Sequence, residues 1–285
     1  MPDGPTVRRR RLGAELRRLR ELHSRKLDEV AGELGLVAST LSRIETGKAP
    51  IRTTYLNRLL DMYEVNDPGA RQVLVDMGRE GHRKGWWADY DDVLPSGFDI
   101  YVGLEAEATG LRCYETTLVH GLLQTQDYAS NVLRELCPKD TEEQVRKMVD
   151  LRMQRQRILE TSPPIEFWLI LDEAAIRRCV GGAAVMRLQL EHLVEASHWP
   201  NVTLQVLGFE SGAHAGMDGA FSILEFPERT DRDVACKDGG YFGIVYLEKD
   251  REVRLFTEAF DLLRAASLSP AASVQLLESV AGGLV

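Results

Sequence analysis

The sequence has few cysteines and no long apolar segment. Its cysteines, Cys113, Cys137, Cys179 and Cys236, are scattered and form no Cys-x-x-Cys pair. This spacing argues against a disulfide framework or a cysteine zinc site and fits reduced thiols. The chain has no run of about 18 apolar residues, and its first residues lack the apolar stretch of a secretory signal. We therefore expect a cytoplasmic protein without a membrane-spanning segment.

Sequence motifs for catalysis, metals and nucleotides are also missing. The chain has no Gly-x-x-x-x-Gly-Lys loop and no Gly-x-Gly-x-x-Gly, and its histidines lack His-x-x-x-His and His-Glu-x-x-His spacing. Ser211 lacks the Gly-x-Ser-x-Gly setting of an activated nucleophile. His214, in a glycine-rich loop with Asp218, and the acidic pair Asp172-Glu173 are the remaining candidates. A structural loop histidine is the simpler interpretation of His214, and a helix cap is the simpler interpretation of the acidic pair. We therefore expect no catalytic residue, no metal and no cofactor.

Residues 24–47 carry a helix-turn-helix pattern. Gly35 can take the positive φ that a sharp turn needs, and the small Ala31 allows two helices to cross closely. Apolar residues at helical spacing lie on both sides of this turn: Leu27, Val30, Ala31 and Leu34, then Leu41 and Ile44. The second helix exposes side chains that can reach bases or phosphates: Ser39, Thr40, Ser42 and Arg43. The pattern predicts a DNA-binding element.

The charge distribution supports this prediction. The whole chain has a net charge of −9, but residues 1–66 carry +4 and the remainder −13. A basic head on an acidic body is typical of a DNA-binding module joined to a domain that does not bind DNA. The expected first helix, 7–22, includes four consecutive arginines, 8–11. They are either a solvated cationic face or contacts to DNA phosphates, and the sequence leaves both open.

Further helices from Tyr55 and near 68–80 complete an expected five-helix domain over 7–80. Gly, Pro and acidic residues mark 81–103 as a connector. Within it, Trp86 and Trp87 are too apolar to remain in water, so we expect them to dock on the chain's own body or on a second subunit. Stacking on a ligand is the alternative.

Residues 104–285 are expected to form an α+β domain, with a mixed or antiparallel sheet covered by helices. After a β-rich run within 104–120, only one strand–helix–strand unit is expected. The helix at 141–160 carries several cations, among them Arg155, which we interpret as a solvated face or structural pairs, with an anion site as the alternative. The expected strands are 165–171, 201–208, 220–226 and 242–248, and the other helices lie near 121–133, 184–198, 251–266 and 270–281.

Residues 12–65 resemble the XRE-type (phage repressor-like) helix-turn-helix family, a five-helix DNA-binding fold. The matching text is Glu29-Val30-Ala31, Gly35, Ser39-Thr40-Leu41-Ser42-Arg43-Ile44-Glu45-x-Gly47 and Leu59-Leu60. The resemblance implies that Ala38, Ser39 and Arg43 read bases and that Arg20 pairs with Glu45. Leu27 stands where the family usually has Gln, so Arg25, Lys26 or backbone amides must anchor a phosphate. Lys48, in the following loop, is a further DNA-binding candidate.

The second half resembles the C-terminal domain of actinobacterial XRE regulators described as antitoxin-like. The matching text includes Gly103-Leu104-Glu105-Ala106-Glu107-Ala108, Gly121-Leu122-Leu123-Gln124-Thr125, Arg155-Gln156, Leu171-Asp172-Glu173-Ala174-Ala175 and His214-Ala215-Gly216. This resemblance implies a regulator that works with a small protein encoded nearby, and it does not imply catalysis.

Together these observations predict a transcription regulator that binds double-stranded DNA as a homodimer, most simply as a repressor. A small-molecule effector or small protein partner would act on the C-terminal domain, with His214, Trp86, Trp87 and Arg155 as candidate contacts. We further expect 202–226 and its loop to line a ligand pocket. Two alternatives stay open: an antitoxin-type protein that mainly sequesters a small partner, and an enzyme fused to a DNA-targeting head.

Overall fold

A computed structural model describes residues 5–81, 85–95, 97–227, 232–238 and 243–284. The contacts between residues divide the chain into two compact units. The described residues up to Asp89, together with Asp99–Glu107, form a helical unit. Tyr90–Phe98, Ala108–Pro227 and the described residues after 231 form an α/β unit. The two units are treated separately below.

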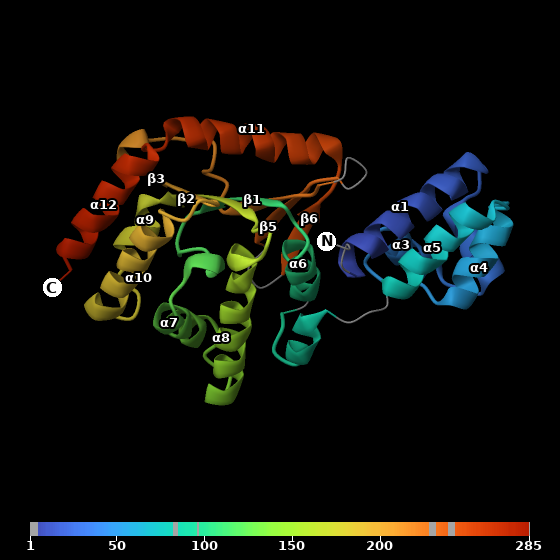
Figure 1. Cartoon of the computed structure of the whole chain (residues 1–285), viewed down its shortest axis with the longest axis horizontal. Helices are drawn as coiled ribbons and strands as arrows, with labels where there is room; N and C mark the ends of the chain where they lie inside the picture. Colours follow the sequence, from blue (N-terminus) through green and yellow to red (C-terminus); the bar gives the residue numbers. More distant parts are fainter. Residues whose placement is uncertain (1–4, 82–84, 96, 228–231, 239–242, 285) are drawn as a thin grey trace. The chain divides into compact units, whose positions relative to one another are not determined.

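The helical unit contains the five predicted helices (Figure 1): α1 (Pro5–Leu22), α2 (Leu27–Leu34), α3 (Ala38–Glu45), α4 (Thr53–Met62) and α5 (Pro68–Glu80). α4 begins at Thr53, before the expected Tyr55. One apolar core joins all five helices and includes Leu16, Val30, Leu41, Leu59 and Leu74. Leu16, Val30, Leu41 and Leu59 have no exposed surface, which is typical of the inward stripe of an amphipathic helix.

The range predicted as a connector contains helical structure. Trp86–Tyr90 form the 3-10 helix η1, and Phe98–Glu105 form α6. Residues 82–84 and 96 of this predicted connector lie outside the described residues. The positive φ of Gly97, 81°, directly precedes α6.

The α/β unit contains one six-stranded sheet of order β3-β2-β1-β4-β5-β6. Its strands are β1 (Gly110–Glu115), β2 (Glu166–Asp172), β3 (Val202–Leu207), β4 (Phe221–Glu225), β5 (Val234–Asp238) and β6 (Ile244–Leu247). β1, β2 and β3 are parallel, with Cys113 opposite Leu169. β4, β5 and β6 continue the sheet in antiparallel pairs, with Tyr114 opposite Phe221. The mixed sheet is confirmed; β5 was not predicted, and Phe242, in the last predicted strand, lies outside the described residues.

Two crossovers connect the parallel strands. The first, from β1 to β2, passes through η2 (Gly121–Leu123), α7 (Gln126–Leu136), α8 (Glu142–Gln156) and η3 (Arg157–Glu160). The second, from β2 to β3, passes through α9 (Glu173–Arg177) and α10 (Ala183–Ala196). The prediction of a single strand–helix–strand unit is therefore wrong. The direction of β1 depends on its pairing with β2, which local sequence does not encode.

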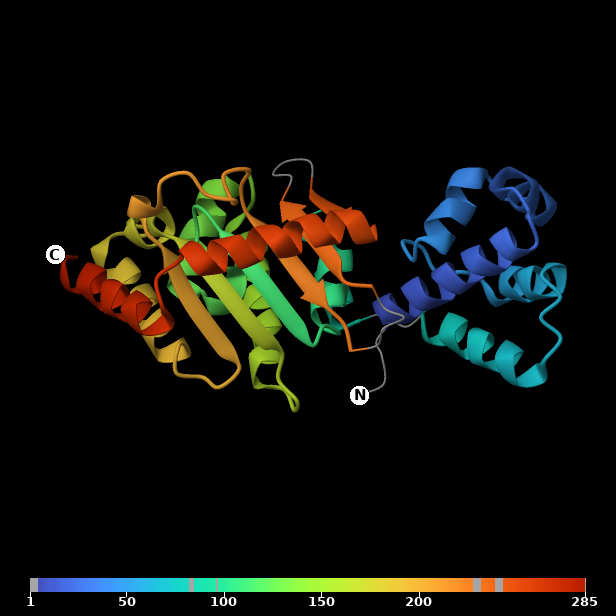
Figure 2. The ribbon, with the colours of Figure 1, turned by 90° about the horizontal axis from the view of Figure 1, so that it is seen from above.

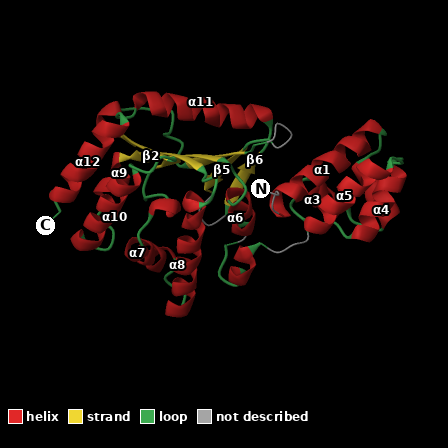
Figure 3. Cartoon of the chain, in the orientation of Figure 1, coloured by secondary structure: helices red, strands yellow, loops and turns green. Residues whose placement is uncertain are grey.

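Helices cover both faces of the sheet. α11 (Asp250–Ala266) runs across the strands on one face, while α7–α10 lie on the other (Figures 1 and 2). α12 (Pro270–Gly282) packs on α10 and β3, and Figure 3 shows this helix-rich layering. Under α11, Phe260 and Leu263 contact an apolar cluster with Tyr114 and Ile170. No helix in the described ranges is both long enough and apolar enough to span a bilayer.

Candidate nucleic-acid interface

The turn between α2 and α3 has the geometry that the sequence pattern predicts. Gly35 ends α2 at φ 72°, in the left-handed region that favours glycine. The backbone N–H of Leu36 then donates to the carbonyl of Ala31 at 2.8 Å. Leu41 and Ile44 anchor α3 in the core of the helical unit at 0% and 5% exposure. These anchors direct the opposite side of α3 to the surface.

That opposite side carries the predicted base-reading residues. Ser39 and Arg43 are exposed, and Ala38, Thr40 and Ser42 are half-buried. The carbonyl of Arg43 accepts the N–H groups of Lys48 and Ala49 at 2.8 and 3.1 Å, which fixes the end of the helix. Within the described parts of the chain, no hydrogen bond or ion pair engages the Arg43 guanidinium. This side chain is therefore available to a base edge.

Arg20 and Glu45, the predicted structural pair, form a bidentate ion pair. Arg20 Nε donates to Glu45 Oε1 at 2.7 Å and Nη2 donates to Oε2 at 2.9 Å. A third bond runs from Arg20 Nη1 to the carbonyl of Arg25 at 3.0 Å. The bond to Glu45 raises the pKa of Arg20, while burial, reinforced by Glu45, raises the pKa of Tyr63 to about 12. The pair thus joins α1, α3 and the turn before α2.

α1 and α3 also approach closely at Gly13. A Cβ added at Gly13 would lie 2.4 Å from the carbonyl oxygen of Ile44, so no larger residue fits without a backbone shift. At the other end of this contact, a Cβ on Gly47 would lie 2.7 Å from the Cα of Arg10. Close contacts with α1 at two points, Gly13 and Gly47, therefore fix the orientation of α3.

The candidates for phosphate contacts differ in how available they are. Arg25 forms an ion pair with Glu33, which follows it on α2. Lys26 and Lys48 are exposed, as the prediction requires. Arg52, immediately before α4, is also exposed and was missed by the sequence analysis, although a cation in the loop after the second helix was a usable signal. In the described ranges, no ion pair or hydrogen bond engages the side chain of Lys48 or Arg52.

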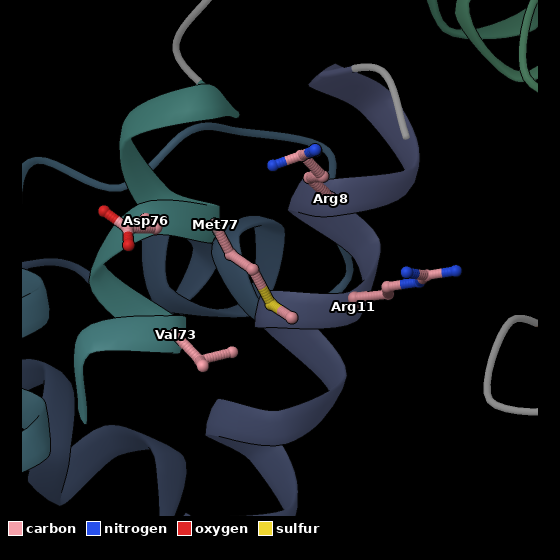
Figure 4. Close-up of a pocket in the computed structure, with 5 residues that line it drawn as sticks. All are labelled: Arg8, Arg11, Val73, Asp76 and Met77. Atoms are coloured by element: carbon pink, nitrogen blue, oxygen red, sulfur yellow. The ribbon is translucent and has the colours of Figure 1, made fainter. Parts of the chain in front are cut away.

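The arginine run of α1 is largely turned to internal partners. Arg8 pairs with Glu80 of α5. Burial lowers the pKa of Arg9, and the charges of Asp99 and Glu107 oppose this effect. Arg8 and Arg11 line a surface pocket between α1 and α5, into which Met77 projects (Figure 4). Two cations, one carboxylate from Asp76 and two apolar side chains line this pocket, a mixture that selects no ligand class.

The structure places Trp87 in a buried position at 7% exposure, with Trp86 half-buried and edge-on to it. Arg155 is also buried, at 6% exposure, and lies 5.0 Å from the centre of the Phe98 ring. The interpretation of Arg155 as part of a solvated face is therefore wrong, because α8 turns this residue into the unit.

Burial and neighbouring positive charge lower the pKa of His120 to about 3, so this imidazole is neutral.

The remaining C-terminal candidates have structural partners. His214 lies edge-on to Tyr114, and its Nδ1 accepts the backbone N–H of Gly216 at 3.2 Å. Asp172 caps α9 through the N–H of Ala174 at 2.9 Å and accepts the Tyr114 hydroxyl at 3.2 Å. The loop after β3 leads to β4, and β2 and β1 separate these two strands in the sheet. β3 and β4 therefore cannot form adjacent walls of the predicted pocket.

Two protein families match this chain. One, described as a domain of unknown function (DUF5753), matches residues 98–279. The chain belongs to the DUF5753 family. The other, described as a helix-turn-helix domain, matches residues 11–74, which include the α2–α3 turn and the Arg20–Glu45 pair. No curated protein and no solved structure matches. The helix-turn-helix match and the geometry of α3 support a DNA-binding regulator with a C-terminal DUF5753 domain.

Proposed function

We propose that this DUF5753 protein is a sequence-specific transcription regulator of the XRE type that places α3 in the major groove of double-stranded DNA. The exposed Arg43, with its guanidinium available on α3, is the observation that carries the proposal. Arginine commonly donates two hydrogen bonds to guanine in this groove. Ala38 and Ser39 would contact neighbouring bases, and Lys26, Lys48 and Arg52 would contact phosphates.

The proposal includes a homodimer in the cytoplasm that acts as a repressor. One short recognition helix contacts too few base pairs for useful specificity, and two-fold symmetry doubles the site that is read. The acidic body, with a net charge of −13 outside residues 1–66, is poorly suited to DNA. Its role would be to bind a small-molecule effector or a small protein partner. The resemblance of this half to antitoxin-like regulators favours such a role.

We assign no reaction to the DUF5753 domain. The two residues that the enzyme alternative would use, His214 and Asp172, have the structural contacts described above. The hydroxyl of Ser211 donates to the carbonyl of Ala266 at 3.4 Å. These contacts give each residue a role in holding loops and a helix cap.

The test is to select bound sequences from random duplex DNA with the full chain and with Arg43→Ala. We expect the wild-type protein to enrich an inverted repeat, and Arg43→Ala to lose preference at one position in each half-site. Arg17→Ala serves as a matched control, because Arg17 is an exposed arginine of α1 that pairs with Glu21. If the wild-type protein enriches no sequence, the proposal fails.

A further inference from the structure

The outer side of α11 carries two exposed leucines. Phe260 and Leu263 fix the inner side of this helix in the core under it, and neither has exposed surface. On the outer side, Leu255 and Leu262 are seven residues apart and are 57% and 63% exposed. Singly exposed apolar residues are common on protein surfaces. Among the helices of the described residues, however, only α11 carries two large apolar side chains with such exposure.

Small residues extend these leucines into a stripe along α11. Ala259 is half-buried and Ala266 is exposed, so Leu255, Ala259, Leu262 and Ala266 follow the spacing i, i+4, i+7 and i+11 of one helix side. Figure 2 looks onto this outer side of α11, with the strands of the sheet behind it. A stripe of this spacing is the surface that one helix buries against another, and alanine side chains allow a second helix to approach closely.

The charges on one flank of this stripe are divided along the helix. Arg251 and Arg254 lie in the first half of α11, and Glu258 and Asp261 lie in the second half. All four side chains are exposed. Within the described ranges, no ion pair engages Arg251, Arg254 or Glu258, while Asp261 lies 3.5 Å from Arg264 of the same helix. The flank therefore has a basic half and an acidic half that are open to a partner.

A second copy of this chain is complementary to both features. When two α11 helices pack antiparallel, the basic half of each flank lies along the acidic half of the other, whereas parallel packing brings like charges together. An antiparallel pair of this kind has the self-complementary surface that a two-fold axis requires. With the axis at the level of Thr257, Leu255 of one copy lies opposite Ala259 of the other, and Arg254 comes within one helical turn of Glu258.

We propose that the outer side of α11 is the interface of a homodimer, in which α11 of a second copy packs antiparallel on it. The leucine–alanine stripe supplies the buried apolar surface, and the divided flank selects the antiparallel direction. This inference rests on the proposed function, because it names the surface that joins the homodimer expected to read an inverted repeat.

The test measures the mass of the full chain by sedimentation over a concentration series without DNA. The variant Leu255→Glu, Leu262→Glu puts charges into the stripe, at exposed positions where glutamate is a good helix former. The matched control is Leu136→Glu, Leu188→Glu, because these leucines of α7 and α10 are 58% and 55% exposed. We expect the wild-type chain and the control to dimerise alike. The α11 variant should dimerise at least about tenfold more weakly, since each substitution occurs twice in a symmetric pair.

Charge exchange tests the antiparallel direction. Arg254→Glu should weaken dimerisation, because it places an acidic side chain along the acidic half of the second copy. The exchange Arg254→Glu, Glu258→Arg should restore dimerisation, because opposite charges then meet again across the two-fold axis. An exchange variant that dimerises as weakly as Arg254→Glu alone would contradict the antiparallel arrangement.

A wild-type chain that stays monomeric over the whole series would overturn the inference, and this is the result expected if a different protein covers α11. Equal dimerisation of the wild-type chain and the Leu255→Glu, Leu262→Glu variant would also overturn it. The failure of the proposed function looks different. In that case, the chain would dimerise through α11 and yet enrich no sequence from random duplex DNA.

Discussion

Breaking the Arg20–Glu45 pair is expected to loosen the recognition helix, with a cost that depends on which partner is removed. In Arg20→Met, the Glu45 carboxylate, with a side chain only 4% exposed, loses its cation. An uncompensated buried charge of this kind costs about 3–5 kcal/mol. In Glu45→Leu, Arg20 keeps its bond to the Arg25 carbonyl and has Glu21 at 3.8 Å. Glu45→Leu therefore removes only the charged hydrogen bonds between Arg20 and Glu45, and it should lower the free energy of unfolding by about 2 kcal/mol.

The double variant Arg20→Met, Glu45→Leu separates the cost of an unpaired charge from the worth of the pair. Replacement of both charges by apolar side chains is often close to neutral. We therefore expect the double variant to be more stable than Arg20→Met alone.

The assay is native-state hydrogen exchange of the α1 and α3 amides in the full chain. Tryptophan fluorescence would not isolate α1 and α3, because neither helix contains a tryptophan and Trp168 and Trp199 report on the α/β unit. For Arg20→Met, the expected cost corresponds to exchange at least about a hundredfold faster. If the two single-variant effects simply add in the double variant, the pair does not act as argued.

Three further predictions concern other parts of the molecule. Lys48→Ala and Arg52→Ala should each weaken binding to all duplex sequences alike and reduce the salt slope by about 0.9, measured by titration at several salt concentrations; a change in sequence preference would contradict this role. Gly13→Ala should lower the stability of the helical unit, measured by hydrogen exchange, because its Cβ would meet the Ile44 carbonyl at 2.4 Å; unchanged exchange would contradict the close contact. Because His120 has a pKa lowered to about 3, below its unfolded value of about 6.5, it contributes stability above the unfolded pKa that is lost as pH falls toward 3. In His120→Gln, unfolding followed by tryptophan fluorescence should show a smaller loss of stability between these pH values, and an unchanged pH profile would contradict a buried neutral imidazole.

The helix-turn-helix could be predicted because its determinants are local. Gly35 at a turn and the apolar residues on either side fix two helices and the side they bury. By contrast, the ion pair between Arg25 and Glu33 joins a turn to the far end of α2, so it depends on the path of the chain. The sequence identifies Arg25 as a cation, but it does not show that the Glu33 carboxylate already pairs with it.

The errors in the second half have a similar cause. β5 has the sequence Val-Ala-Cys-Lys-Asp, which is short and only weakly alternating, and its pairing with β4 and β6 makes it a strand. α6 contains Ile100, Val102 and Gly103, which are poor helix formers, and burial stabilises it as a helix. The burial of Arg155 could not be predicted either, because the sequence of α8 does not show which of its cations faces inward. Tertiary contacts decide all three.

The most direct measurement of the central claim is the contact between Arg43 and a base. Once a bound sequence has been selected, affinities of the wild-type chain and Arg43→Ala are compared on that site and on duplexes changed at single positions. We expect Arg43→Ala to lose about 1–3 kcal/mol on the selected site and to become indifferent to one base pair in each half-site. If Arg43→Ala keeps both the affinity and the full sequence preference, α3 does not read DNA in the way proposed.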